Sequence, residues 1–332
     1  MKLIVDAMGG DNAPQAIVQG CIDAAHEYGT KITLVGVSDI LGRELNARNA
    51  PKENFEIIHA DEVIGADESP VMAIRRKKNS SMVKAVELLK EYRDGVVISA
   101  GNTGALMASG LLKAGRIEGI DRPALAPLVP TRNMRGTLLL DAGANTDCTS
   151  DNLMQFALMG SIYMEKVMGR NNPSIALLNI GHEETKGNEL AKETYRRMKE
   201  MKNINFIGNV EPRDIVEGAA DVLVCDGFVG NVVLKLIEGV ALSLFGMLKQ
   251  EFMATTVSKL GALMLKPRLK NIKAKMDYAE HGGAPLLGIN GGIIKAHGSS
   301  DSKAIKNAIR QGKIFIEQEV LENIRNFAHI KS

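Results

Sequence analysis

Residues 1–14 read MKLIVDAMGGDNAP and join a short apolar run to a glycine-rich corner. The run Lys2–Ala7 has the character of a buried β-strand, and the glycine pair after it breaks the strand. Pro14 suits the first turn of a following helix, with Asp11 or Asn12 as the residue that caps it. A strand, a polar turn and a helix in this order form the first unit of an α/β protein.

The rest of the chain repeats this alternation. The further strand candidates are Lys31–Val37, Phe55–Ala60, Val96–Ser99, Thr137–Leu140, Ser174–Asn179, Asn205–Ile207 and Val222–Cys225. The pattern predicts a doubly wound, three-layer αβα sandwich of the Rossmann-like type, although an eight-stranded barrel also fits. The open sheet is favoured because residues 299–331 predict one long final helix with no strand after it. Without repeats or long linkers, we expect one large α/β domain over residues 1–332, with its cleft at the carboxyl ends of the strands.

The composition is that of a folded globular protein, with 332 residues of which 45% are hydrophobic. No run approaches about 18 apolar residues and the first residues lack signal-peptide features, so we expect a cytosolic protein. Cys21, Cys148 and Cys225 lie far apart, which predicts free thiols rather than disulfides or a zinc site. The net charge of +2 gives no reason to expect a nucleic-acid partner.

Five strand candidates end in a glycine-rich turn that leads into a helix: AMGGDNAP, SAGNTG, DAGANTD, NIGHEETKG and CDGFVGN. Glycine lets backbone N–H groups approach a ligand closely, and a helix N-terminus attracts negative charge. Because the carboxyl ends of parallel strands lie at one edge of a sheet, we expect these turns to share one edge and to bind an anion, above all phosphate. A further glycine-rich loop, His281–Ser300, precedes the final helix, which Ser299 or Ser300 is expected to cap.

The turns lack several well-known catalytic and nucleotide-binding patterns. No GxGxxG follows a strand and no GxxxxGK[ST] is present, which disfavours a standard dinucleotide or P-loop site. HExxH and GxSxG are also absent, so neither a metalloprotease nor a serine hydrolase is indicated.

With the strings VDAMGGDNAP, SAGNTGALMA, LLLDAGAN, NIGHEETKG, CDGFVGNVVLK, GGAPLLGINGG and AHGSS, the sequence resembles the PlsX family over nearly its whole length. These are the acyl-acyl carrier protein:phosphate acyltransferases of bacterial phospholipid synthesis. The resemblance implies a fold related to phosphate acetyltransferases and to isocitrate and isopropylmalate dehydrogenases, and a homodimer. It also implies that long-chain acyl-acyl carrier protein and inorganic phosphate give acyl phosphate and free carrier protein, with acyl phosphate passing to a membrane-bound glycerol-phosphate acyltransferase.

Two other functions stay open. The turns would equally suit a phosphate acetyltransferase-like enzyme that uses acyl-coenzyme A, and a membrane-associated scaffold of lipid synthesis would bind similar partners without turnover. For either enzyme, phosphate attacks a thioester, so the site must hold an anion and stabilise an oxyanion; neither a metal nor an organic cofactor is required.

The candidate catalytic residues are a cation, an amide and a proton donor: Lys186, Asn231 and His297. The residues expected to bind phosphate or substrate are Gly9, Gly10, Asn12, Gly101, Asn102, Thr103, Asn145, Gly227, Gly230 and Ser299. A covalent route through Cys225 is conceivable but not needed. The strand-end carboxylates, which would repel phosphate, are expected mostly to cap helices or brace loops; they are Asp6, Asp11, Asp141 and Asp226. An apolar groove for the acyl chain is expected from Met107, Leu111 and Leu112, or from the leucines of APLLG.

One segment carries the positive surplus. Residues 252–276 contain six basic and no acidic residues, and their apolar residues follow helical spacing, with Pro267 expected to separate two short helices. This pattern predicts a basic amphipathic hairpin on an anionic membrane; the alternative is a dimer contact or lid. The membrane candidates are Leu260, Leu263, Met264, Lys266, Arg268, Leu269, Lys270, Ile272 and Lys273. This segment, or the smaller cluster Arg75–Lys78, is expected to dock the acidic carrier protein.

Overall fold

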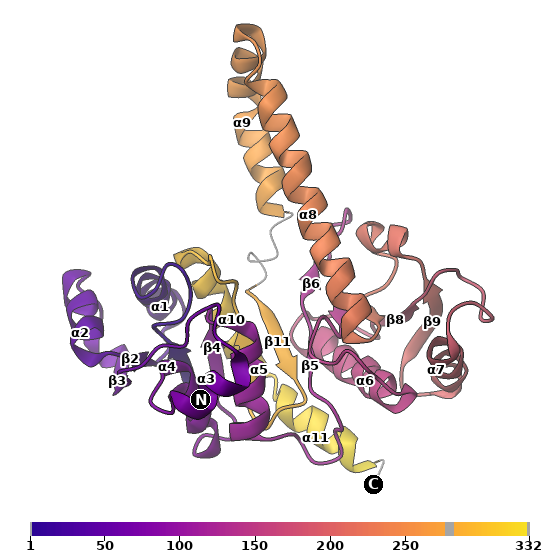
Figure 1. Ribbon diagram of the computed structural model, residues 1–332, viewed down its shortest axis with the longest axis horizontal. Helices are drawn as coiled ribbons and strands as arrows, with labels where there is room; N and C mark the ends of the chain where they lie inside the picture. The colour runs from indigo at the N-terminus through magenta and orange to yellow at the C-terminus, as the bar shows by residue number, and fades with distance from the viewer. Residues whose placement is uncertain (1, 276–281, 331–332) are drawn as a thin grey trace.

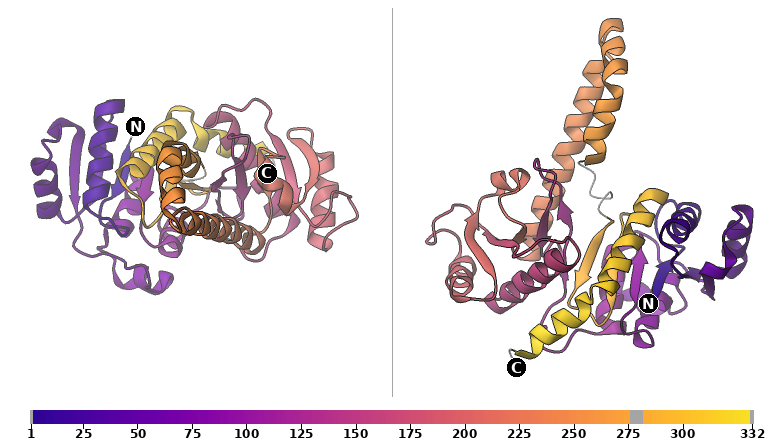
Figure 2. Two further views of the ribbon diagram at one scale, coloured as in Figure 1. Left: turned by 90° about the horizontal axis from the view of Figure 1, so that it is seen from above. Right: turned by 180° about the vertical axis from the view of Figure 1, so that it is seen from behind.

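The computed structural model describes residues 2–275 and 282–330, and the side chains of residues 2–269 and 282–328. These residues form two lobes, each built around its own β-sheet, and a long helical hairpin that projects away from them (Figure 1). The views from above and from behind show the same division (Figure 2).

The first lobe holds a seven-stranded sheet of order β3-β2-β1-β4-β12-β11-β5. Its strands are β1 (Leu3–Asp6), β2 (Ile32–Gly36), β3 (Phe55–His59), β4 (Val96–Ser99), β5 (Ala124–Leu125), β11 (Ala284–Leu287) and β12 (Gly292–Lys295). The neighbours among β3, β2, β1, β4 and β12 pair in parallel. β11 is antiparallel to both of its neighbours, β12 and β5. β1, β2 and β4 are wholly buried, as expected of central strands covered by helices on both faces.

The second lobe holds a five-stranded sheet of order β6-β7-β10-β8-β9. Its strands are β6 (Leu128–Val129), β7 (Thr137–Leu140), β8 (Ser174–Leu178), β9 (Asn205–Val210) and β10 (Val222–Val224). All of them pair in parallel except β6, which is antiparallel to β7. β5 and β6 are consecutive along the chain, so this short stretch passes from the first sheet to the second.

The helices cover both sheets, and several end at identifiable signals. They are α1 (Gln15–Tyr28), α2 (Ser38–Ala47), α3 (Pro70–Arg76), α4 (Ser81–Glu87), α5 (Thr103–Ser109), α6 (Ser150–Lys166), α7 (Glu189–Glu200), α8 (Gly227–Phe252), α9 (Thr256–Lys275), α10 (Ser302–Glu317) and α11 (Val320–Ile330). Short 3₁₀ turns cover Lys52–Asn54, Leu88–Lys90 and Pro212–Glu217, and α5 continues into a π-helical turn, Gly110–Ala114. α1 packs on α10, and one cluster of buried apolar side chains runs through both lobes, from Leu3 and Ile98 to Leu140 and Phe156.

The predicted fold class is confirmed, and every predicted strand is present with small shifts of its ends. The turns expected at one sheet edge belong instead to two sheets, because β5 and β6 divide the strands between the lobes. The segment expected as a loop before the final helix contains β11 and β12 in its described part. The final helix is two helices, α10 and α11, and Asp301 caps the first of them in place of Ser299 or Ser300.

The hairpin consists of α8 and α9. Pro267 lies inside α9, so the prediction that it separates two short helices is wrong. Large apolar side chains along both helices are exposed, among them Leu236, Leu242 and Leu263. The backbone of Lys270, Ile272 and Lys273 belongs to α9, but their side chains lie outside the described residues.

α8 is long and apolar enough, by length and composition, to cross a membrane. Its 26 residues contain an 18-residue window of mean hydropathy 1.7, of which 6% is buried. No unbroken apolar run of this length is visible in the sequence, because Lys235, Glu238, four glycines and one serine interrupt the helix.

Candidate active site

Three turns meet at the carboxyl edge of the first sheet. They follow β1, β4 and β12, and we call residues 9–12, 101–103 and 297–299 the anion cradle. The Asp11 N–H donates to the Gly298 carbonyl at 2.8 Å, and the Asn12 amide donates to the carbonyls of Ser299 and Ser300 at 3.1 and 3.2 Å. β1 and β4 are neighbours at the point where the strand order reverses, which is where open α/β sheets bind ligands.

The close approach of the first two turns requires glycine at position 9. A Cβ atom there would lie 2.4 Å from Asp6 Oδ2 and 2.9 Å from the Gly101 nitrogen. The absence of a side chain at Gly9 therefore lets the turns after β1 and β4 come together. Gly10 has a φ of 102°, a backbone conformation that favours glycine.

His297 stands in the cradle with its Nδ1 toward Ser299. The Ser299 N–H donates to Nδ1 at 3.2 Å, and the Ser299 hydroxyl oxygen lies 2.7 Å from the same atom. Because Nδ1 accepts the backbone hydrogen bond, the proton of the neutral ring belongs on Nε2. The neutral ring of the exposed His297 thus carries an Nε2–H that can donate a hydrogen bond.

Lys295, at the end of β12, was not singled out from the sequence, where it looked like one more residue of a glycine-rich loop. Its half-buried ammonium donates to the carbonyls of Ala100, at 3.4 Å, and Ala296. Burial lowers the pKa of Lys295 to about 8, while Asp6 and Asp11 act in the opposite direction. The ammonium of Lys295 thus lies next to the turn after β4, which forms part of the cradle.

The second sheet presents its own carboxyl edge, built around the buried Asp141. Its carboxylate accepts hydrogen bonds from the N–H groups of Leu125, Ala144 and Asn145 at 2.9, 3.2 and 2.7 Å, and burial raises its pKa. Asp141 therefore braces this loop, and it reaches the first sheet because Leu125 belongs to β5. Asp226 caps α8 by accepting from the Val229 N–H.

Glycine at positions 227 and 230 serves packing at this edge. A Cβ on Gly230 would lie 1.9 Å from the Asp141 carbonyl oxygen, and the Gly227 N–H already donates to the Asn145 carbonyl at 2.7 Å. Cys225 is buried, its Sγ donates to the Asp141 carbonyl at 3.6 Å, and burial raises the pKa of the thiol well above its usual value. It has the setting of a small buried residue rather than of a nucleophile.

Asn231 and Lys186 are exposed at this second edge. Asn231 lies beside Gly143, where an added Cβ atom would come 3.5 Å from the Asn231 amide carbon. Lys186 follows β8, and its carbonyl accepts from the Asn179 amide at 3.0 Å. Within the described residues, no hydrogen bond or ion pair joins either side chain to the anion cradle, so the candidate residues fall into two groups.

Three candidate amides are already engaged. The Asn102 side chain caps α5 by accepting from the Ala105 N–H at 2.9 Å and also donates to carbonyls of the 65–68 loop. The Asn145 amide donates to the Pro123 carbonyl at 2.7 Å. Asn12 bridges to the β12 turn and does not cap α1, whose N-cap is Pro14, and Asp11 does not cap it either. These three side chains therefore hold the turns in place; Thr103 is the first residue of α5.

A cavity of about 620 Å³ lies between the turns of the two sheets. Gly104 of α5 borders it from the first sheet, and Ala144 and Asn145 border it from the second. Its other lining residues are Met107, Ala108, Leu111, Arg116, Asp121, Arg122, Pro123 and Leu286. Leu112, which was also expected in an acyl groove, is 57% exposed and is not among the lining residues.

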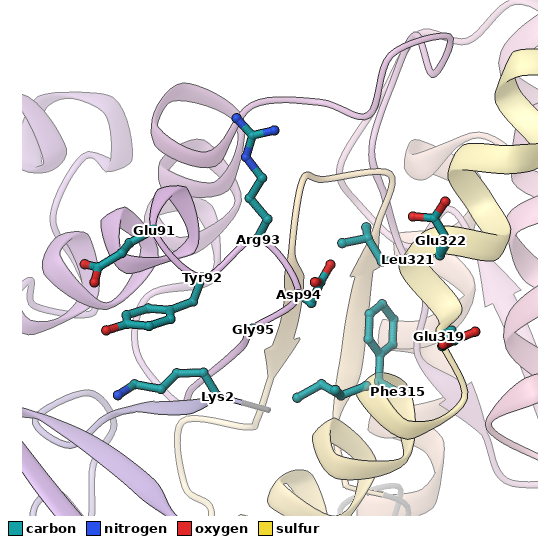
Figure 3. Close-up of a pocket in the computed structure, with 11 residues that line it drawn as sticks. Lys2, Glu91, Tyr92, Arg93, Asp94, Gly95, Phe315, Glu319, Leu321 and Glu322 are labelled. Atoms are coloured by element: carbon teal, nitrogen blue, oxygen red, sulfur yellow. The ribbon is translucent and has the colours of Figure 1, made fainter.

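A second cavity, of about 530 Å³, lies at the opposite edge of the first sheet. Lys2 and Tyr92 lie on one side of it and Phe315 and Leu321 on the other (Figure 3). Because Lys2 precedes β1 and Gly95 precedes β4, this is the amino edge of the strands, away from the side where such sheets bind ligands.

Comparison with known proteins identifies the family. Residues 1–323 match the family model described as "Fatty acid synthesis protein". The chain is 54% identical over 325 residues to "Phosphate acyltransferase" of Alkaliphilus oremlandii, covering 98% of this chain and 96% of the relative. The chain belongs to the PlsX family. A second PlsX-family relative, "Phosphate acyltransferase" of Clostridioides difficile, is 50% identical, with 98% and 96% of the two chains covered.

Solved structures share the fold. A phosphotransacetylase from Streptococcus pyogenes has a TM-score of 0.62 at 17% identity, covering 97% of this chain and 94% of the other. A branched-chain phosphotransacylase from Enterococcus faecalis scores 0.60 at 16% identity, with coverage of 95% and 99%. A 4-hydroxythreonine-4-phosphate dehydrogenase from Klebsiella pneumoniae scores 0.54 at 14% identity, with coverage of 95% and 99%. These confirm the fold predicted for this PlsX-family member, which is an acyltransferase of fatty acid and phospholipid synthesis.

Proposed function

We propose that this acyltransferase moves the acyl group of long-chain acyl-acyl carrier protein to inorganic phosphate, releasing acyl phosphate and free carrier protein. The observation that carries the proposal is the anion cradle, where the turns after β1, β4 and β12 converge with Lys295 and His297 at the carboxyl edge of the first sheet. The names of the relatives, which are phosphate acyltransferases, support phosphate as the acceptor.

Each residue type in the site has a defined task. The cradle holds phosphate, and a phosphate oxygen attacks the thioester carbonyl carbon, so that a C–O bond forms and an oxyanion develops. The exposed amide of Asn231 is the proposed donor to this oxyanion. When the C–S bond breaks, the Nε2–H of His297 donates a hydrogen bond to the departing carrier thiolate, which takes up the proton that hydrogen phosphate loses as its oxygen bonds to the carbonyl carbon. Lys186 is proposed as a second cation, provided by the other sheet edge.

Partners and location follow from the same reaction. The basic cluster Arg75–Lys78, at the end of α3, is the proposed docking site for the acidic carrier protein. Acyl phosphate is amphiphilic and labile, so a membrane-bound glycerol-phosphate acyltransferase is the proposed consumer. We also propose a cytoplasmic protein that lies peripherally on the membrane through α9, where Leu260, Leu263 and Met264 are exposed near Lys266 and Arg268. Homodimerisation through α8 is proposed as well.

The decisive experiment is trapping of acyl phosphate with hydroxylamine. Purified protein is supplied with phosphate and either acyl-acyl carrier protein or acyl-coenzyme A of the same chain length. Phosphate-dependent acyl hydroxamate from the carrier substrate is expected. Preference for the coenzyme A substrate, which the shared fold with phosphotransacetylases would suit, would replace the proposal, and no product from either would refute both.

The same assay tests the residues. Lys186→Ala, Asn231→Ala and His297→Ala are each expected to lower kcat by about 10²–10³-fold if they stabilise the transition state. Near-normal rates in all three variants would contradict the assignment.

A further inference from the structure

The cavity between the two sheets, which Gly104 and Asn145 border, has the shape and chemistry to hold an amphiphile. It begins next to the anion cradle, since Gly104 directly follows cradle residues Asn102 and Thr103. On the other side it borders the DAGAN turn of the second sheet. A molecule whose head occupied the cradle would therefore have this cavity beside its tail.

Most of the lining is apolar. Met107, Ala108 and Ala144 are partly buried and pack against the same core cluster as Leu286, which is 2% exposed. Leu111 adds a further wall from the π-helical turn that continues α5. Such turns interrupt regular helix and are frequent at functional sites. The apolar side of the cavity is thus continuous with the hydrophobic core.

The polar part of the lining carries a positive charge that no described protein group neutralises. The Asp121 carboxylate accepts from the Gln155 amide at 2.9 Å, and the Arg116 guanidinium donates to the Asp121 carbonyl. Arg122 makes no hydrogen bond or ion pair with any residue that the structure describes. An apolar cavity with such a guanidinium at its edge matches a ligand with an apolar tail and an anionic head.

The volume favours a long tail. A water molecule occupies about 30 Å³ in the liquid and a methylene group is of similar size, so a cavity of about 620 Å³ has room for on the order of 20 such groups. We propose that this cavity binds the acyl chain of the substrate, with Met107, Leu111 and Leu286 as its walls and Arg122 in its polar lining. This rests on the proposed acyl transfer to phosphate and names the place of the acyl group within that site.

Binding of alkylphosphonates tests the cavity without turnover. Hexadecylphosphonate and butylphosphonate, which cannot be transferred, are titrated into the full chain by calorimetry. Leu111→Trp and Met107→Trp, which fill the cavity, are expected to weaken binding of the 16-carbon probe by about tenfold or more and to leave the 4-carbon probe near the wild-type value. Arg122→Gln is expected to weaken both probes by about tenfold.

Leu112→Trp is the matched control, because Leu112 is the next residue of the same helical turn but lies outside the lining. It is expected to bind both probes as the wild type does. Equal binding of the 16-carbon probe by the wild type and by both cavity variants, or an equal loss in Leu112→Trp, would overturn the proposal. Thermal melting of each variant separates loss of binding from loss of fold.

Hydroxylamine trapping with acyl-acyl carrier proteins whose acyl groups have 4 to 16 carbons then distinguishes the proposed acyl transfer from the proposed acyl-chain cavity. If the wild type forms no acyl phosphate from any carrier, the proposed function fails, while the phosphonate titration still decides the cavity. If the wild type is active, Leu111→Trp is expected to move the preference toward short chains. An unchanged chain-length profile would refute the acyl cavity and leave the proposed function standing.

Discussion

Lys295 brings an ammonium group to the cradle from the end of a β-strand, where water is partly excluded. Burial disfavours its charged form, and Lys235 of α8 adds a like charge, whereas Asp6 and Asp11 favour the charged form. The result is a pKa of about 8, so the group is still mostly protonated at neutral pH. A partly buried cation lowers the stability of the fold unless a negative charge pairs with it, so its presence suits a site that binds an anion.

Lys295 is expected to make the activity depend on pH. Since Lys295 loses its proton near pH 8, kcat/KM for phosphate is expected to fall as the pH rises through that value. Lys295→Arg keeps the charge and is expected to remove this fall, because arginine stays protonated. Trapping of acyl hydroxamate between pH 6 and about 9.5 is the measurement, and identical profiles for the two proteins would contradict the role of Lys295.

Stability provides an independent check on the same residue. The folded-state pKa of Lys295 is below its unfolded value, so the buried ammonium lowers stability below pH 8, and this cost is relieved as the pH rises. Lys295→Met is therefore expected to be at least as stable as the wild type at pH 7 while losing activity. Its advantage in urea denaturation is expected to shrink toward pH 10. Greater instability at pH 7 would show that the ammonium mainly supports the fold.

Packing at Gly230 gives a second residue-scale prediction. Gly230→Ala places a methyl group against the Asp141 carbonyl and is expected to lower the free energy of unfolding by roughly 3 kcal/mol. Gly239→Ala, in the same helix α8, is the control, since no atom lies within 4 Å of its Cβ position. Better helix propensity is expected to make that variant more stable by about 0.5–1 kcal/mol. Chemical denaturation measures both, and equal effects would contradict this account of Gly230.

At the scale of residues, the sequence predicted which turns carry the polar groups but not which side chains remain available. Asn102 and Asn145 stand at turn positions like that of Asn231, yet the first two are bound to nearby backbone groups. Lys295 was missed because its importance comes from the pairing of β12 with β4, which places it beside Ala100. Because this pairing joins residues about 200 positions apart, no short stretch of the sequence indicates it.

At the scale of elements, the strands with strong apolar runs are predicted correctly, whereas the sequence predicts a loop where β11 and β12 lie. β11 contains Pro285, β12 begins at Gly292 and glycines flank both strands, so local propensity disfavours a strand there. Hydrogen bonds to β4 and β5 outweigh that propensity. Pro267 gives a parallel case, because α9 continues through it while packing along α8. A proline inside a helix costs about 3 kcal/mol or more, which contacts outside the helix have to offset.

The exposed apolar surface of α9 leads to the third prediction. Leu260→Glu with Leu263→Glu is expected to reduce flotation with anionic liposomes, since both side chains are more than 60% exposed and would lose their insertion into the interface. Activity on soluble substrate is expected to be retained. Gln250→Glu adds charge near the tip of α8 without removing an apolar group and is expected to float like the wild type. Undiminished flotation of the double variant would assign the surface to another partner.

At the scale of the whole molecule, the division into two sheets could not be read from the sequence. The strand–helix alternation continues evenly through it, and β5 and β6, which divide the sheets, have two residues each. Strands this short have no periodicity to recognise. The projecting hairpin was also hidden, because only the complete fold shows that α8 has no sheet to cover along most of its length (Figure 1).

The exposed side of α8 is expected to join two copies of the chain. Val232, Leu236, Val240 and Leu244 recur every four residues along α8 and are exposed, so they form one apolar face. Sedimentation of the wild type is expected to show a homodimer, and Leu236→Glu with Val240→Glu is expected to yield monomer. Leu242→Glu makes the same chemical change on the opposite side of α8 and is expected to stay dimeric. Dimers in the double variant would place the interface elsewhere.

The contacts of Asp141 are expected to make the two lobes unfold together on heating. Its carboxylate is bound by Leu125 of the first sheet and by Asn145 of the second, and the largest apolar cluster crosses between them. Neither sheet can melt without exposing the other's core and leaving that buried carboxylate unsatisfied. Calorimetry should accordingly record a single endotherm, with a van't Hoff enthalpy close to the calorimetric one. Heat would thus inactivate the enzyme in one step, without a stage at which one lobe survives alone.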